Sequence, residues 1–300
     1  MNIEELNAHF GNKKQLKFVE DASGIVMIEI ENTLASARVC LQGAQLKTWR
    51  PRTTSIPVVW LPEDAQCIQG KSLHGGAPIC WPWFGVHATE KNYPAHGFAR
   101  VAPWQLIAVT EEADGATRLV LQMQDSPLRQ QYWPQASELT LAITIGHQLS
   151  MQLTTKNTGK EAFSFTEAIH TYFQISDIEK VSVLGLAGCT YIDTVGERTS
   201  RLQEGNIRFV AETDRIYINS ESECMIEDTG LMRKIRIIKK GSHSTVVWTP
   251  WTEKANKLAD LASGWRQMVC VESGNAAVNQ LTLPAGESHV LAVEYSTTAL

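Results

Sequence analysis

Residues 139 to 155 read Leu-Thr-Leu-Ala-Ile-Thr-Ile-Gly-His-Gln-Leu-Ser-Met-Gln-Leu-Thr-Thr. Apolar side chains recur at nearly every second position over 139–145 and again over 149–155, which is the period of a β-strand with one face buried. The turn residues Asn157-Thr158-Gly159 follow, and another alternating run begins just beyond them, from Phe163 to Ile175. This succession of short strands and turns predicts antiparallel β-structure.

Similar signals extend along the rest of the chain. Ile25 to Ile30 alternates in the same way, and Asp114-Gly115 is a turn signal ahead of the apolar stretch 119–123. The sequence has no internal repeat, no low-complexity tract and no linker rich in proline or serine. It therefore predicts an all-β fold, a single domain over residues 1–300 built as one large antiparallel β-sandwich.

Two segments have helical features, and both are short. The first runs from Ile3 to Phe10. The second runs from Trp251 to Leu261, where Thr249 can cap the helix and Pro250 can take its first position. We therefore expect few helices beside the strands.

Composition narrows the class of protein. The chain has 300 residues, of which 43% are hydrophobic and 20% charged, so it can bury a large core. Its net charge of −5 argues against a nucleic-acid partner. The basic cluster 233–240 does not change this, because isoleucines interrupt its charges as in a solvated or edge strand. No uncharged apolar stretch is long enough to span a bilayer, so we expect no membrane association and a cytoplasmic location.

The six cysteines are widely scattered and include no C-x-x-C pair, so they give no zinc or redox signature. We expect reduced thiols, no bound metal and no cofactor. The sequence leaves the oligomeric state open, and a monomer is compatible with it.

The run from Phe163 to Ile175 can be analysed face by face, because alternate side chains of a strand point to opposite sides of the sheet. Its odd positions are mostly apolar, whereas its even positions carry polar and aromatic groups and include His170 and Tyr172. This predicts that His170 faces a ligand groove. Taken alone, a histidine on a strand is more often structural than catalytic.

Glu272 ends the apolar run 268–271 and precedes Ser273-Gly274. Burying a carboxylate in so apolar a strand is costly unless it is paired or used. The other interpretation is that the strand has already reached solvent and that Glu272 lies at its rim. The residues alone favour neither.

Two loops offer ligand-binding groups. Residues 73–85 are rich in glycine, proline and aromatic residues, so backbone amides and indole faces could meet a sugar there, although we expect Trp81 and Phe84 to pack in the core. Residues 93–100 place His96 and Arg100 on either side of a glycine-containing turn. A guanidinium matches phosphate oxygens, so Arg100 is a candidate anion ligand.

Taken together, these motifs resemble the hexose-6-phosphate mutarotases, the glucose-6-phosphate 1-epimerase branch of the aldose 1-epimerase superfamily. They occur in family order over nearly the whole chain. They are His-Gly-Gly-Ala-Pro-Ile-Cys-Trp-Pro-Trp-Phe-Gly at 74–85, His-Gly-Phe-Ala-Arg at 96–100, Leu-x-x-x-Asn-Thr-Gly at 153–159, Ala-Ile-His-Thr-Tyr-Phe at 168–173, Thr-Asp-Arg-Ile-Tyr at 213–217, Val-Val-Trp-Thr-Pro-Trp at 246–251 and Cys-Val-Glu-Ser-Gly at 270–274.

The resemblance implies a galactose-mutarotase-like sandwich that binds a hexose phosphate and needs no cofactor. By the matching motifs it implies His170 as general acid and Glu272 as general base, with Asp214 orienting the sugar and Arg100 binding substrate. For this assignment His170 should start protonated, which a nearby carboxylate would favour. The histidines His74 and His96 are expected at the substrate as well.

The chain departs from the family pattern at two positions. The family usually has arginine before Gly-Gly-x-Pro and often glutamine before His-Gly-Phe-Ala-Arg, where this chain has His74 and Ala95. One phosphate-facing arginine is thus absent, so a mutarotase of unphosphorylated aldoses is the main alternative. A sugar-phosphate sensor would be expected to lack one member of the proton pair. A glycoside hydrolase would need two carboxylates, and Glu272 has only Asp214 as an obvious mate.

Overall fold

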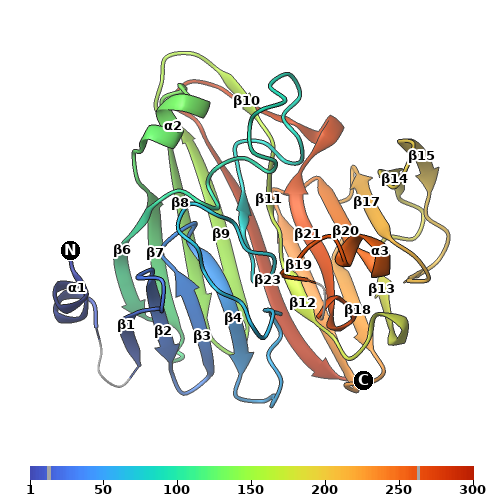
Figure 1. Cartoon of the computed structure of the whole chain (residues 1–300), viewed down its shortest axis with the longest axis horizontal. Helices are drawn as coiled ribbons and strands as arrows, with labels where there is room; N and C mark the ends of the chain where they lie inside the picture. Colours follow the sequence, from blue (N-terminus) through green and yellow to red (C-terminus); the bar gives the residue numbers. More distant parts are fainter. Residues whose placement is uncertain (12–14, 262–263) are drawn as a thin grey trace.

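The computed structural model describes residues 1–11, 15–261 and 264–300. Its strands form two layers, with a nine-stranded sheet behind and two further sheets in front of it (Figure 1). Neighbouring strands pair antiparallel throughout both layers. The predicted all-β, antiparallel fold class is therefore confirmed.

The nine-stranded sheet is the larger layer. The two alternating runs of 139–155 form its β8 and β9, a hairpin in which Ile145 pairs with Leu149. In spatial order its strands are β16 (Ile207–Arg208), β13 (Val181–Leu184), β18 (Cys224–Asp228), β19 (Arg233–Lys240), β23 (Ser288–Ala299), β9 (Leu149–Asn157), β8 (Ser137–Ile145), β7 (Thr117–Met123) and β6 (Trp104–Glu111).

The front layer consists of a four-stranded and an eight-stranded sheet, joined at their adjacent edges by a bridge between Leu46 and Ala77. The four-stranded sheet is β1 (Leu16–Glu20), β2 (Val26–Glu31), β3 (Ala35–Cys40) and β4 (Gln45–Pro51). The eight-stranded sheet is β15 (Thr199–Leu202), β14 (Thr190–Asp193), β17 (Thr213–Ile218), β20 (Ser244–Thr249), β21 (Met268–Asn275), β11 (Glu167–Ile169) and β5 (Ile79–Cys80), with β12 (Tyr172–Gln174) also paired to β21. A separate pair is β10 (Phe163–Phe165) with β22 (Leu281–Leu283).

The main hydrophobic core lies between the two layers. Trp49 of β4 is fully buried and donates from its indole nitrogen to the Gly146 carbonyl in the β8–β9 turn, at 3.2 Å. Tyr295 of β23 is fully buried as well, and its hydroxyl is 2.7 Å from that of Thr171, between β11 and β12. Each large apolar side chain buried in this way stabilises the fold by about 1.5–3 kcal/mol.

The helices are short, but their bounds differ from those expected. The N-terminal helix α1 (Ile3–His9) forms as predicted, with a capping box at Asn2. Trp251 to Leu261 is helical only over α3 (Trp251–Ala255), and Pro250 caps it without a side-chain bond. The expected Thr249 cap is wrong, because this residue belongs to β20 and its hydroxyl has no partner. The remaining helical turns are α2 (Pro127–Tyr132), η1 (Ile178–Lys180), η2 (Trp265–Gln267) and η3 (Ala277–Asn279).

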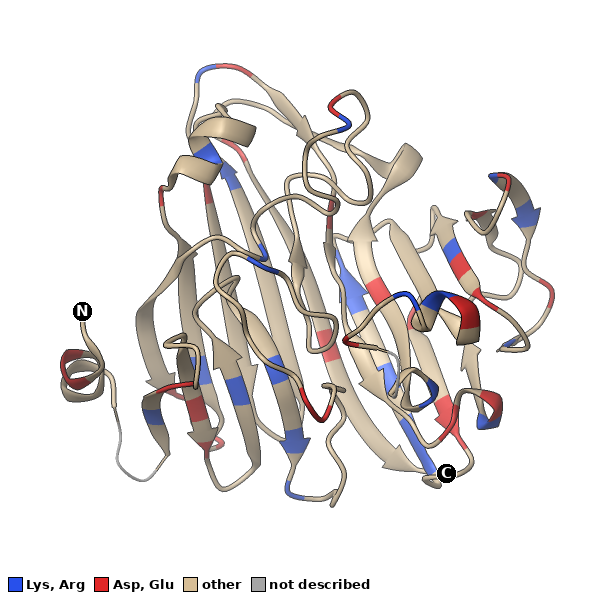
Figure 2. Cartoon of the chain, in the orientation of Figure 1, with Lys and Arg blue, Asp and Glu red and all other residues tan. Residues whose placement is uncertain are grey.

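The basic cluster 233–240 is β19, an interior strand of the nine-stranded sheet and not an edge strand. Arg236 and Lys240 are exposed on its outer face, which agrees with the predicted solvated strand. Lys239 points inward and is buried, and its ammonium donates to the Ser244 carbonyl and the Thr245 hydroxyl at 3.0 and 2.6 Å. Positive and negative residues are interspersed over the chain (Figure 2).

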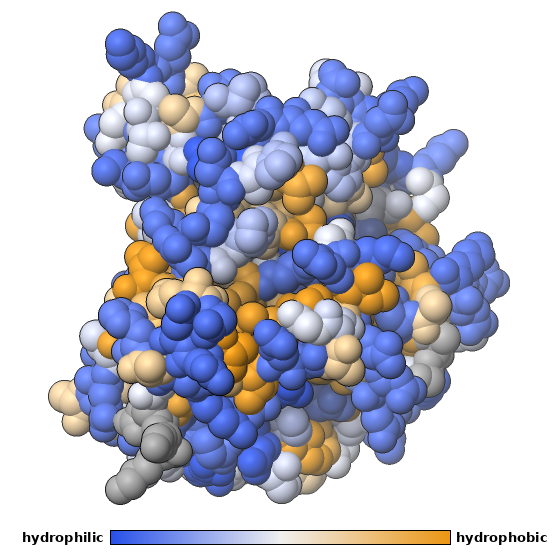
Figure 3. Space-filling model, turned by 60° about the vertical axis from the view of Figure 1, so that its left-hand side comes forward, coloured by the Kyte–Doolittle hydropathy of each residue, from blue (hydrophilic) through white to orange (hydrophobic). Residues whose placement is uncertain are grey.

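Among the described residues, no helix has the length and apolar character needed to cross a bilayer. The surface in Figure 3 is mostly hydrophilic, is hollowed near its middle, and shows hydrophobic residues between the hydrophilic ones there.

Candidate active site

The run from Phe163 to Ile175 keeps its predicted alternation but is not one strand. Ile169 and Phe173 point into the core between the layers, whereas His170 and Tyr172 lie on the other face of the eight-stranded sheet. The strand is interrupted because its amides bond to an irregular segment, His170 N–H to Pro78 and Tyr172 N–H to Gly76. The register with β21 is nevertheless the same on both sides of the break, since Ile169 pairs with Ser273 and Tyr172 with Cys270, so His170 lies opposite Glu272.

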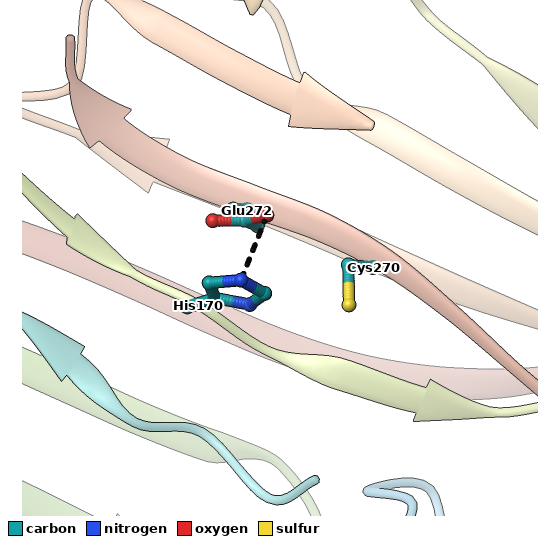
Figure 4. Close-up of side chains that lie close together, drawn as sticks. All are labelled: His170, Cys270 and Glu272. Carbon is teal, nitrogen blue, oxygen red and sulfur yellow. Dashed lines mark ion pairs between the residues drawn. The ribbon is translucent and has the colours of Figure 1, made fainter. Parts of the chain in front are cut away.

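His170 and Glu272 form the centre of this face. His170 Nε2 lies 3.4 Å from Glu272 Oε1 (Figure 4). Glu272 pairs with Val246 in the middle of β21, and its side chain is only 1% exposed, so the interpretation of Glu272 as a rim residue is wrong. His170 Nδ1 and Glu272 Oε2 are buried without a hydrogen-bond partner. Such unsatisfied groups are costly in a purely structural pair and are expected where a ligand completes the bonding.

Burial favours the neutral forms of both groups. It lowers the pKa of the His170 imidazole well below its ordinary value, and the positive charge of Arg100 adds to this. It raises the pKa of the Glu272 carboxyl well above its ordinary value. Both shifts favour a proton on the carboxyl of Glu272 over one on the imidazolium of His170. That His170 starts protonated stays a prediction: desolvation of the imidazolium opposes it, and the attraction of the carboxylate favours it.

Aromatic rings surround His170. Its ring stacks on Tyr172 with centroids 4.8 Å apart and an angle of 7° between the planes, and Trp248 meets it edge-on at 6.3 Å. Tyr172 and Trp248 belong to a small apolar cluster with Trp60 and Cys270, apart from the main core. The rings of Tyr172 and Trp248 supply aromatic faces of the kind that pack against the apolar side of a sugar.

His74 lies beside this aromatic cluster and is held by a carboxylate. Both oxygens of Asp260 are 2.9 Å from His74 Nδ1, and one of them accepts from the His74 amide at 3.1 Å. The His74 ring lies 6.4 Å from Tyr172 and 6.5 Å from Trp248. The sequence offered no signal for Asp260, which is separated from His74 by 186 positions.

His96 and Arg100 are further neighbours of His170. The His96 ring meets His170 edge-on at 5.6 Å, and Arg100 donates to the Ala95 carbonyl at 2.8 Å. Burial lowers the pKa of His96 to about 3, with further lowering by Arg100, so its ring is neutral. Gly97 is required next to it, because a Cβ there would lie 2.0 Å from the Trp81 carbonyl oxygen.

Asp214 lies on β17, in register with Trp248 of β20. Its carboxylate is 3.9 Å from Lys254 Nζ, which also lies 6.0 Å from the Trp248 ring. Burial raises the pKa of Asp214, and the charge of Asp214 helps to raise that of Glu272. The six residues expected from the sequence, His74, His96, Arg100, His170, Asp214 and Glu272, are therefore brought to one face of the eight-stranded sheet.

Of the two aromatic residues of the loop 73–85 that were expected in the core, one is buried there and the other is not. Trp81 is fully buried in the main core, as expected. Phe84 is not a core residue: it is half-buried on the site's side of the sheet, 4.8 Å edge-on from His96, beside Ile216 and Val246.

Cys270 is a neighbour of the pair that the sequence analysis did not single out. It shares the face of Glu272 because the two are separated by one residue on β21, and this parity could have identified it. The donor atoms of His170, Cys270 and Glu272 all lie within 4.8 Å of one another (Figure 4). Among the described residues this is the one set with the composition and spacing to hold a metal ion.

The His170 side chain is only 9% exposed. Two hollows lie elsewhere on the protein. One, of about 500 Å³, lies over β1 to β4 and includes Lys17, Glu29 and Arg38, and another, of about 330 Å³, lies near 53–56 and 231–233. Neither contains a predicted site residue.

Known proteins share this sequence and architecture. A sequence model of the aldose 1-epimerase family matches residues 26–296. A protein of Escherichia coli K12, provisionally named glucose-6-phosphate 1-epimerase, is 33% identical over 266 residues, 88% of each chain. A Salmonella typhimurium LT2 protein with the same provisional name is 34% identical over 256 residues, 85% of this chain and 84% of that one. The crystal structure of YeaD from Salmonella typhimurium, provisionally described as a mutarotase, superposes with a TM-score of 0.88 at 30% identity and 99% coverage of both chains.

Proposed function

The chain belongs to the aldose 1-epimerase family of isomerases, and from that membership we propose that it interconverts the α and β anomers of a hexose 6-phosphate. The observation that carries the proposal is the buried His170–Glu272 pair, whose facing atoms are 3.4 Å apart and whose remaining atoms lack partners. One shared proton and two bases are what mutarotation requires.

The reaction opens and recloses the sugar ring. A base takes the proton of the anomeric O1 hydroxyl while an acid gives one to the ring oxygen O5, the C1–O5 bond breaks, and the aldehyde turns about C1–C2 before the steps reverse. We assign Glu272 to O1 and His170 to O5. This requires His170 to carry the proton and the carboxyl of Glu272 to be ionised when the sugar is bound. General acid and base each contribute about 10²–10⁴-fold.

The residues around the pair would fix the sugar. Asp214 can accept from sugar hydroxyls, neutral His96 can donate or accept beside His170, and Arg100 supplies the permanent positive charge on this side. Phosphate binding at a distance from C1 would add affinity and orient O1 and O5 toward the pair.

A second candidate is a mutarotase of unphosphorylated aldoses, favoured by one observation. Asp260 is bonded to His74 through both oxygens, so it places a negative charge at the position where the phosphate subsite is expected. A sugar without phosphate would avoid that repulsion.

Exchange spectroscopy by NMR tests the proposal directly. Glucose 6-phosphate, free glucose and galactose are supplied separately to the same enzyme preparation, and the rate of α/β exchange is compared with that without enzyme. We expect the largest acceleration for the phosphorylated sugar. Equal or greater acceleration for a free sugar would select the second candidate, and no acceleration for any of them would contradict mutarotase activity.

A further inference from the structure

We propose that Cys270, His170 and Glu272 form a binding site for a thiophilic divalent cation, with Zn²⁺ as its representative, and that the bound ion inhibits anomer exchange. The inhibition rests on the proposed function, because the ion would occupy both proton-transfer groups. The site itself does not, since it depends only on the three donor atoms.

The donor set suits zinc in both kind and spacing. Imidazole nitrogen, thiolate sulfur and carboxylate oxygen are its usual ligands, and tetrahedral bonds of 2.0–2.2 Å place nitrogen and oxygen about 3.3–3.5 Å apart. His170 Nε2 and Glu272 Oε1 are already 3.4 Å apart. All three donor atoms lie within 4.8 Å of one another, so a rotation of the Cys270 thiol toward the pair would complete three ligands.

The surroundings favour a ligand at this position. His170 Nδ1 and Glu272 Oε2 are buried without partners, so neither side chain is held by a competing bond at those atoms. Stacking on Tyr172 at 4.8 Å and contact with His96 at 5.6 Å hold the imidazole ring in place.

The thiol should set the selectivity of the site. Sulfur selects Zn²⁺ or Cd²⁺, whereas Mg²⁺ requires oxygen ligands in near-octahedral geometry and keeps several waters. A second histidine–glutamate pair, His289–Glu167, has an asparagine in place of a thiol. It should not bind zinc.

Inhibition is measured on enzyme first freed of metal by a chelator. We expect micromolar Zn²⁺ to suppress exchange of glucose 6-phosphate, an excess of EDTA to restore it, and millimolar Mg²⁺ to have no effect. Cys270→Ala should retain basal exchange and require at least about tenfold more Zn²⁺ for the same inhibition. Cys80→Ala is the matched control: Cys80 is also buried on this sheet face, with its sulfur 3.5 Å from His96 Nδ1, and its loss should leave zinc sensitivity unchanged.

Cobalt provides a readout independent of activity. Co²⁺ bound to the wild-type protein should give a thiolate-to-metal charge-transfer band that Zn²⁺ displaces and that both Cys270→Ala and Cys270→Ser abolish. Unchanged zinc inhibition in folded Cys270 variants, acceleration of exchange by zinc, or absence of the cobalt band in wild type would each overturn the proposal. If no sugar is turned over but the band is present and depends on Cys270, the metal site stands and the proposed function fails.

Discussion

Two histidine–glutamate pairs lie on opposite faces of the eight-stranded sheet, with their glutamates on β21 and β11, and the pairs differ in how fully they are bonded. On the outer face, His170 and Glu272 are 3.4 Å apart, and each has an atom without a partner. On the inner face, His289 Nε2 is 3.0 Å from Glu167 Oε1, which also accepts from Asn275 at 3.1 Å, and Glu167 Oε2 is the one atom of this pair that is buried without a partner. Residue types alone would not distinguish the two pairs.

The inner pair connects the two layers of the sandwich. Glu167 belongs to β11 in the front layer and His289 to β23 in the rear layer, and His289 Nε2 is also 3.0 Å from the Gly241 carbonyl. The outer pair connects two segments of the front layer and faces away from the rear one. We infer that the inner pair supports the fold and the outer pair performs chemistry. Each of the following experiments tests this difference in role between the two pairs.

Removing either member of the outer pair should give the largest effect. His170→Ala and Glu272→Gln should each lower kcat for anomer exchange by about 10²–10⁴-fold, the usual contribution of a general acid or base. The free energy of unfolding should change little in Glu272→Gln, which keeps the size of the side chain, whereas His170→Ala also loses the ring stacked on Tyr172 and should lower it by about 1–3 kcal/mol. NMR exchange rates and urea denaturation measure the two quantities.

The matched control is Glu253→Gln, an exposed glutamate on the nearby helix α3 that should leave kcat unchanged. The double variant of His170 and Glu272 should be hardly slower than either single variant, because the two groups act in one event. Near-normal exchange in a single variant would remove His170 or Glu272 from the mechanism.

Removing the charge of the inner pair should affect stability instead. Glu167→Gln leaves His289 without its counter-charge and should lower the free energy of unfolding by about 3 kcal/mol, the lower end for a broken buried pair. The kcat should change little. Chemical denaturation and exchange kinetics on the same preparation give both numbers.

An exposed pair provides the reference for this second experiment. Glu223 lies 2.6 Å from Arg236, but the two side chains are 48% and 47% exposed. Glu223→Gln should cost less than about 1 kcal/mol. If Glu167→Gln costs no more than this, or if it lowers kcat as strongly as Glu272→Gln, the two faces are not functionally distinct.

The sequence predicted which residues share a face of the sheet better than it predicted their burial and their bonding partners. The period of two placed His170 and Tyr172 on one face and Ile169 and Phe173 on the other, although the run is interrupted where its amides bond to 76–78. It could not decide whether Glu272 was buried, because that depends on β20 and on the loops that cover β21. The partners of His74 and Glu167 could not be predicted from the sequence either, because Asp260 and His289 come from distant segments of the chain.

A third pair, His74–Asp260, lies nearer to solvent and should have a smaller effect, on specificity. Its side chains are 34% and 32% exposed. His74→Arg would restore a permanent positive charge and a bidentate partner for phosphate. We expect the KM for glucose 6-phosphate to fall by about three- to tenfold, up to 1.4 kcal/mol, with little change for free glucose. An equal change for both sugars would show that His74 does not face the phosphate.

The smallest expected effect is a pH dependence of stability that comes from the inner pair alone. Burial opposes the charge of His289, but the hydrogen bond and charge of Glu167 raise its pKa above the ordinary value of about 6.5. A histidine whose pKa is raised in the folded protein adds stability that is complete below about pH 6.5 and is lost as the pH rises through the folded value. Burial also raises the pKa of Glu167, so this group too favours the folded state at the lower pH.

Relative to His289→Gln, the wild type should therefore lose free energy of unfolding between about pH 6 and pH 9. Titration of groups common to both proteins, His170 and Glu272 included, cancels in the difference. His147→Gln, at an exposed turn, should show no such difference from wild type. If the free energies of unfolding of wild type and His289→Gln differ by a constant amount across this range, His289 is uncharged in the folded protein. The inner pair is then held by hydrogen bonds alone.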